Sequence, residues 1–126
     1  MKNLLFVLML TPMVALTAAP DFSAITRALN SGDVATLAKY MDNTVEVGIL
    51  GEEGVYRKVQ AAQILKQFFV EHAPKSFSLV HQGTNNKSLH YCIGKMECGA
   101  DKFRVTYYIK EVNGEFLIQE IGIEKG

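Results

Sequence analysis

Five side chains in the second half of the chain carry the groups that could do chemistry: His81, His90, Cys92, Tyr107 and Glu120. A carboxylate or an imidazole on an apolar floor can act as a general base, and desolvation there raises the pKa of a carboxylate. The same groups also have a structural interpretation, because buried polar groups are normally hydrogen-bonded. In that interpretation Glu120 accepts a hydrogen bond from the Tyr107 hydroxyl, and His90 is a satisfied residue of the core or of a pocket edge. Both interpretations require the fold to bring these side chains together.

A β-hairpin over residues 103–124 sets the positions of two of them. Asn113-Gly114 separates two runs rich in β-branched and aromatic residues, and this dipeptide suits the positive φ angles of a type I′ turn. With a two-residue turn, Val112 lies opposite Glu115. One face of the hairpin then carries these side chains: Phe103, Val105, Tyr107, Ile109, Phe116, Ile118 and Glu120. Strict alternation puts Glu120 opposite Tyr107.

The strand before the hairpin adds Cys92 and His90 to this face. If Glu97 faces Lys102 across a four-residue turn, Cys92 lies opposite Tyr107. Cys92, Tyr107 and the carboxylate then form a row across the face that helices should cover, and His90 lies one row away.

A fourth strand would bring in His81. Pairing Gly83 with Ser88 places His81 on the same face, beside His90. The sequence therefore predicts a pocket between sheet and helices, with convergent polar groups on an apolar floor. Its predicted lining is His81, His90, Cys92, Tyr107 and Glu120.

Metal binding and a disulfide are both disfavoured by spacing. His81, His90 and Cys92 are ligand types that hold zinc, but their spacing resembles no zinc signature, so we expect no metal and no cofactor. Cys92 and Cys98 lie ~20 Å apart along a continuous strand, whereas a disulfide needs Cα atoms within ~7 Å. We expect both cysteines to remain thiols, although an exported protein could form disulfides.

The opposite face of the sheet is predicted to carry an apolar patch. Its expected members are Tyr91, Ile93, Tyr108, Leu117, Ile121 and Ile123. If no helix covers this patch, it needs a partner, and a homodimer would bury it. The alternative is ordinary exposed apolar surface, which is common on small domains.

The expected helices precede a run of consecutive antiparallel strands along the chain, and this order predicts an α+β domain. Two short helices are expected within Asp21–Met41, where Asp21 or Ser23 can cap the first and Gly32-Asp33 separates it from the second. The longest helix is expected over Lys58–Ala73, before Pro74. Strands are expected over residues 44–50, 55–57, 76–83 and 88–97, with a turn at 51–54. The three helices should pack on one face of a curved, mainly antiparallel sheet.

The N-terminal residues 1–19 are predicted to be a secretory signal peptide. Lys2 precedes the apolar run Leu4–Leu10, which is too short to span a bilayer, and small residues allow cleavage after Ala18 or Ala19. Residues 20–126 then form a single exported domain, periplasmic or secreted, without a membrane anchor. The chain has 13 basic and 13 acidic residues, so loss of Lys2 leaves 12 against 13. A balance near −1 gives no electrostatic case for binding nucleic acid.

Several stretches resemble an exported bacterial family known as domain of unknown function 4783. They are DNTVEVGIL, EGVYRKVQAAQILKQFF, PKSFSLVHQG, YCIGKM and the ending FRV…NGEFLIQEIGIE. They occur in this order, and the resemblance covers essentially the whole mature chain, from the first helix to the last strand. The resemblance implies the cone-shaped fold of nuclear transport factor 2 and implies export, but it brings no activity with it. Family members resemble this chain less at Glu120, where they often carry Gln, so the resemblance implies no shared catalytic role for that residue.

These observations favour a non-enzymatic domain that binds a small molecule or a protein partner, with a homodimer formed through the outer sheet face. One alternative is a small acid/base enzyme that uses Glu120 or His90 inside the cone, although fold analogy is a weak argument for function. Another is an interaction module whose core is filled and which has no pocket.

Overall fold

Within residues 22–85 and 88–126, which the computed structural model describes, the chain forms three helices and six strands. The elements are α1 (Ser23–Ser31), α2 (Val34–Lys39), β1 (Met41–Ile49), β2 (Glu52–Arg57), α3 (Lys58–Glu71), β3 (Ser76–Thr84), β4 (His90–Cys98), β5 (Asp101–Val112) and β6 (Glu115–Lys125). The expected signal peptide and Asp21 lie outside the described residues. None of the helices in the described part is long and apolar enough to cross a membrane.

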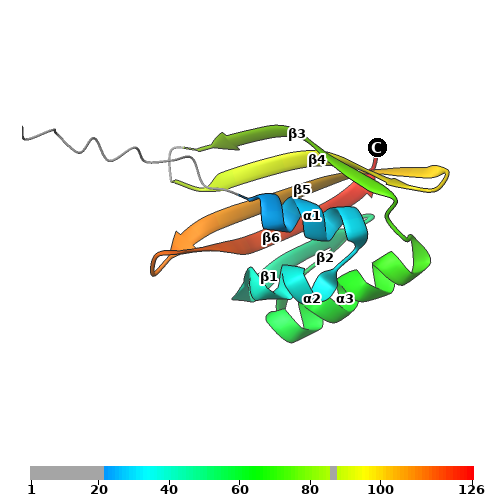
Figure 1. Cartoon of the computed structure of the whole chain (residues 1–126). Coiled ribbons are helices and arrows are strands. Elements are labelled where there is room, and N and C mark those ends of the chain that lie inside the picture. The colour runs from blue at the N-terminus through cyan, green and yellow to red at the C-terminus, as the bar shows by residue number, and fades with distance from the viewer. Residues whose placement is uncertain (1–21, 86–87) are drawn as a thin grey trace, which may run out of the picture.

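The strands form one sheet in the order β2-β1-β6-β5-β4-β3, in which only β1 and β6 pair in parallel. Figure 1 shows all three helices on one face of this curved sheet, with α1 over its centre and α2 beside α3 near β1 and β2. The expected α+β architecture is confirmed. The core lies between the helices and this inner face, and its fully buried side chains include Leu29, Leu65, Met96, Val105 and Tyr107.

The connection between α1 and α2 follows the predicted glycine and cap. Gly32 has φ 68°, a left-handed conformation that glycine adopts without steric cost. The Asp33 backbone N–H then donates to the Ala28 carbonyl at 2.8 Å, and the Asp33 carboxylate accepts from the Thr36 N–H at 3.2 Å. This cap turns the chain so that α2 runs beside α3. The predicted cap of α1 by Asp21 or Ser23 is wrong, because Phe22 occupies the N-cap position without a side-chain cap hydrogen bond and Ser23 is already the first residue of the helix.

The predicted hairpin turn and the register between β4 and β5 are both confirmed. Asn113 and Gly114 have φ 51° and 82°, as a type I′ turn requires, and Val112 pairs with Glu115. Cys92 pairs with Tyr107 in the unbroken register of β4 against β5.

The predicted pairing of Glu120 with Tyr107 is wrong, because β6 contains a bulge. Ile109 pairs with Ile118 and Tyr108 pairs with Glu120, so Gln119 is an extra residue. The Gln119 side-chain amide donates to the Asp42 carboxylate at 2.9 Å, where the pairing of β6 with β1 is also irregular. The bulge reverses the alternation of every later residue in β6.

Beyond this bulge, the predicted faces are therefore exchanged. Ile121 and Ile123 were expected on the outer face, but both side chains are fully buried under the helices. Glu120 was expected on the inner face, but it lies on the outer face beside Glu46 of β1.

The predicted pairing of Gly83 with Ser88 is also wrong. Gly83 pairs with Tyr91, and a bulge between Leu79 and His81 moves His81 to the outer face, opposite Ile93. Phe77 precedes the bulge and is buried on the inner face as expected.

The turn expected at residues 51–54 lies earlier, at Leu50-Gly51. Both residues have positive φ, 51° and 91°, and the Leu50 N–H donates to the Ile123 carbonyl at 2.9 Å. Ile49 then pairs with Glu52, so β2 starts at Glu52.

Candidate functional site

Cys92 and Tyr107 lie side by side on the inner face, but they are core residues. Both side chains are fully buried. Burial raises the pKa of the Cys92 thiol and of the Tyr107 phenol, so both groups are neutral at physiological pH. The Thr26 hydroxyl and the Cys92 thiol both lie near enough to the Tyr107 hydroxyl to influence its pKa as weak hydrogen-bond neighbours, but no described residue meets hydrogen-bond distance and angle with it. These two side chains fill space where a ligand would have to sit.

His90 lies on the edge of the same face and is held there by its neighbours. Its Nδ1 is 2.9 Å from the Thr84 hydroxyl, and its ring packs edge-on against Phe22 and Phe116 at centroid distances of 5.7 and 5.5 Å. This arrangement matches the predicted satisfied residue of a pocket edge.

His81 does not join His90, because the β3 bulge places it on the outer face. There its Nε2 is 3.2 Å from the Tyr91 hydroxyl, and the two rings lie 5.4 Å apart. Gly83 allows this contact, since a Cβ at that position would come within 2.4 Å of the Tyr91 hydroxyl. His81 therefore belongs to the outer surface.

Glu120 lies in a shallow hollow of about 240 Å³ on the outer face. Its pKa is raised, first by partial burial and then by the neighbouring carboxylates of Glu46 and Glu53. The raised pKa agrees with the prediction, but its location does not. Glu120 and His90 lie on opposite faces of the sheet, so they cannot form an acid/base pair.

Metal binding has no support in the described residues. In the stretches 22–85 and 88–126 no three His, Cys, Asp or Glu side chains lie close enough together to hold a metal ion. The set His81, His90 and Cys92 is divided between the two faces, because only His90 and Cys92 share the inner one.

The expected patch on the outer face is smaller than predicted. Tyr91, Ile93 and Tyr108 do lie on this face and are half-buried, next to Thr106. Leu117 is half-buried near the start of β6, and two members of the predicted patch, Ile121 and Ile123, are in the core.

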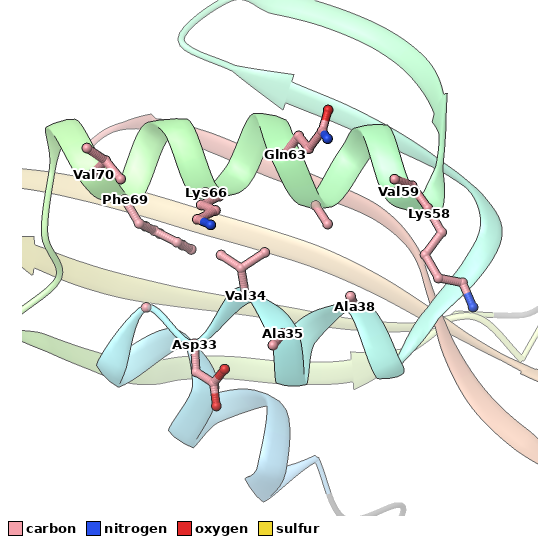
Figure 2. A pocket seen from close by; sticks show the side chains of 12 residues that line it. Asp33, Val34, Ala35, Ala38, Lys58, Val59, Gln63, Lys66, Phe69 and Val70 are labelled. Atoms are coloured by element: carbon pink, nitrogen blue, oxygen red, sulfur yellow. The ribbon is translucent and has the colours of Figure 1, made fainter.

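The largest of the described hollows is open and apolar. It lies between α2 and α3 and has a volume of about 630 Å³. We call it the α2–α3 groove. Its walls are Gly32, Asp33, Val34, Ala35 and Ala38 from the α2 side, and Lys58, Val59, Ala62, Gln63, Lys66, Phe69 and Val70 from α3. Figure 2 shows Val34 and Phe69 pointing toward one another across it.

Small side chains explain why the groove is open. Ala35 and Ala38 on α2 face Ala62 on α3, and none of them is long enough to fill the space between the helices. The rim is apolar at both ends, since Val59 and Val70 are 69% and 75% exposed. Apolar exposure around a concave surface is typical of binding sites.

Sequence analysis missed this groove, although α3 carries a signal for it. Val59 and Val70 fall on the side of the helix that also carries the polar residues Gln63 and Lys66. Two valines on the solvent side of an amphipathic helix indicate a second apolar contact.

The family comparison matches nearly the whole described chain. The sequence profile of the family described as Domain of unknown function (DUF4783) matches residues 22–124. No match was found among the curated proteins.

Solved structures show the same fold. A DUF4783 family protein from Bacteroides ovatus is 27% identical, with a TM-score of 0.79 over 86% of this chain and 96% of that one. A second, from Bacteroides uniformis, is 25% identical, with a TM-score of 0.79 over 85% and 98%. An NTF-2 like protein of unknown function from Silicibacter pomeroyi is 10% identical, with a TM-score of 0.60 over 82% and 88%. The predicted nuclear transport factor 2-like fold is confirmed.

Proposed function

Starting from the fact that this chain belongs to the DUF4783 family, we propose that it is a non-enzymatic binding domain whose binding surface is the α2–α3 groove. The observation that carries this proposal is the contrast between a filled interior and an open groove. Cys92 and Tyr107 occupy the space between sheet and helices, whereas alanines leave the space between α2 and α3 empty.

The placement of the titratable groups supports a non-catalytic role. The alternative of a small acid/base enzyme places Glu120 or His90 inside the cone, because a general base must lie within reach of its substrate. Glu120 lies on the outer face, and His90 lies at the inner edge, where its Nδ1 is engaged by Thr84. These positions outside the interior of the cone disfavour the alternative.

Dye binding tests the groove without knowledge of its natural ligand. Nile red is neutral and apolar, so it should bind the wild-type groove and fluoresce. Ala62→Leu retains a high helix propensity and fills part of the groove. If the dye then loses roughly 55 Å² of apolar contact with the groove, at ~25 cal/mol per Å², its binding should weaken about tenfold. Gln60→Leu is the matched control, because Gln60 lies on the same helix but lines a separate hollow beside Tyr56 and does not line the groove. Equal dye binding by wild type and Ala62→Leu would contradict the proposal.

A homodimer through the outer face is a second proposal. The outer face has Tyr91, Ile93 and Tyr108 half-buried at its centre, and Figure 1 shows no helix on that side. A two-fold axis would place this patch against the same patch of a second copy.

Sedimentation tests this dimer. Ile93→Glu puts a charge into the centre of the patch and should shift a dimer to monomer, while Gln60→Glu on the helix side should leave it unchanged. A wild-type protein that is monomeric at high concentration would refute the proposed dimer.

Export is also a proposal, supported by the pattern of Lys2, the apolar run Leu4–Leu10 and the small residues before Pro20. Intact-mass measurement of the protein from its native source should find an N-terminus at Ala19 or Pro20. An N-terminus at Met1 or Lys2 would contradict export by this signal.

A further inference from the structure

We propose that the α2–α3 groove receives an amphipathic helix of a partner protein, and that the polar flank of this helix is acidic. This inference rests on the proposed function of the groove and adds the chemical class of its occupant. The charge of the groove walls and the shape of the groove each support it independently.

The charge argument comes from two lysines on α3. Lys58 and Lys66 both line the groove, and no described carboxylate lies within 4.0 Å of either ammonium group, although Lys58 is near enough to Asp42 to help lower the pKa of that carboxyl. They are eight positions apart, about 12 Å along the helix axis. A partner helix carries side chains at the same spacing two turns apart, so two of its carboxylates could meet both lysines.

The one acidic residue of the groove wall, Asp33, offsets only part of the charge of Lys58 and Lys66. The Asp33 carboxylate caps α2 by accepting from the Thr36 N–H and, at 2.6 Å, from the Thr36 hydroxyl. These bonds hold the pKa of Asp33 below its usual value. Figure 2 shows this carboxylate pointing away from α3, whereas Lys58 and Lys66 project from the α3 wall. The groove therefore presents a net positive rim.

The shape argument favours a helix over an extended acyl chain. The groove is open to solvent along its length, and its exposed valines, Val59 and Val70, are eleven positions apart, about 16 Å. A ligand pocket buries most of a small molecule, which an open groove does not do. An amphipathic helix needs only its apolar face covered and keeps its polar face in water. The alanines of α2 and α3 let such a helix approach closely.

Two synthetic peptides test the proposal directly. The first is an end-capped, fluorescein-labelled helix of about 18 residues with leucines at i, i+3, i+4 and i+7 and glutamates on both flanks. The second has lysines in place of the glutamates. Fluorescence anisotropy at low salt should show that the acidic peptide binds at least about tenfold more tightly than the basic one, and that added salt reduces the difference.

Charge reversal on the protein locates the effect. Lys58→Glu and Lys66→Glu should each weaken acidic-peptide binding about three- to tenfold and improve basic-peptide binding. Lys95→Glu is the matched control, because Lys95 lies on the outer sheet face, and it should leave both affinities unchanged.

The other outcomes separate the two proposals. Equal binding of both peptides, lost in Ala62→Leu, would overturn the acidic preference and leave the groove as the binding surface. Binding of dodecanoate at the groove without binding of the acidic peptide would overturn the helix in favour of an acyl-chain ligand. If Nile red and both peptides all fail to bind, the proposed function and this inference are both wrong.

Discussion

Replacing Tyr107 with phenylalanine should stabilise the protein. The Tyr107 ring is fully buried, and its hydroxyl has no hydrogen-bond partner among the described residues. A buried hydroxyl without a partner costs ~1–3 kcal/mol, and Tyr107→Phe removes that cost. The small void left by the oxygen loses only a few contacts of ~0.1–0.2 kcal/mol each. We expect a net gain of about 1 kcal/mol, because the ring keeps its place beside Phe77.

Thermal and urea unfolding measure this gain. For a domain of about 100 residues, a gain of ~1 kcal/mol raises Tm by ~4–8 °C. Tyr108→Phe is the matched control, since Tyr108 is half-buried on the outer face and its change should stay within ~0.5 kcal/mol. If Tyr107 instead donated a hydrogen bond to Glu120, as strict alternation predicts, Tyr107→Phe would lose ~1 kcal/mol. A loss of that size would show that the Tyr107 hydroxyl has a hydrogen-bond partner in solution, either Glu120 or its neighbours Thr26 and Cys92, and would refute the expected gain.

Three further predictions concern individual side chains. The pKa of Glu120 is raised above its ordinary 4.5, so the folded state binds this proton more tightly than the unfolded state and stability falls as pH rises above about 4.5. Glu120→Gln should therefore raise Tm at neutral pH, and melts at lower pH should show the gain disappearing; a constant gain would contradict the shift. The pKa of Asp42 is lowered mainly by the Gln119 amide, so in Gln119→Ala an NMR titration should find it closer to 3.8; an unchanged value would mean that this bond is absent in solution. Cys92 and Cys98 are both buried thiols, and a thiol reagent should count two after denaturation without reductant and none in the native protein; a count of zero after denaturation would show that they are joined.

Local patterns predicted most of the fold. Helix stripes, the Gly32-Asp33 connection and the Asn113-Gly114 turn each depend on neighbouring residues only, and each is present in the structure. The pairing of Cys92 with Tyr107 was also predictable, since a tight turn at Gly99 fixes the register of both strands.

The candidate site was predicted less well, because a single bulge reverses a face. The extra residue of the β6 bulge, Gln119, is hydrogen-bonded to Asp42, which is 77 positions away in the sequence. The spacing of the isoleucines in β6 does indicate the bulge. Ile118 and Ile121, both buried, are three positions apart, whereas Ile121 and Ile123 keep the two-residue period of a regular strand. Giving that spacing more weight than strict alternation would have placed Glu120 on the outer face.

The groove depends on tertiary packing that no local pattern specifies. Its alanines are ordinary helix residues until α2 and α3 lie side by side, and only then does their small size leave space. Its exposed valines, Val59 and Val70, were the available signal.

The central claim is that binding takes place at the α2–α3 groove and outside the space between helices and sheet. Backbone amide NMR shifts during titration with the acidic peptide test it most directly. If the peptide binds in the groove, the largest shifts will fall on the amides of Ala35, Val59, Lys66 and Val70. The amide signals of Cys92 and Tyr107 will not shift. Large shifts at Cys92 and Tyr107, with none along α2 and α3, would contradict it.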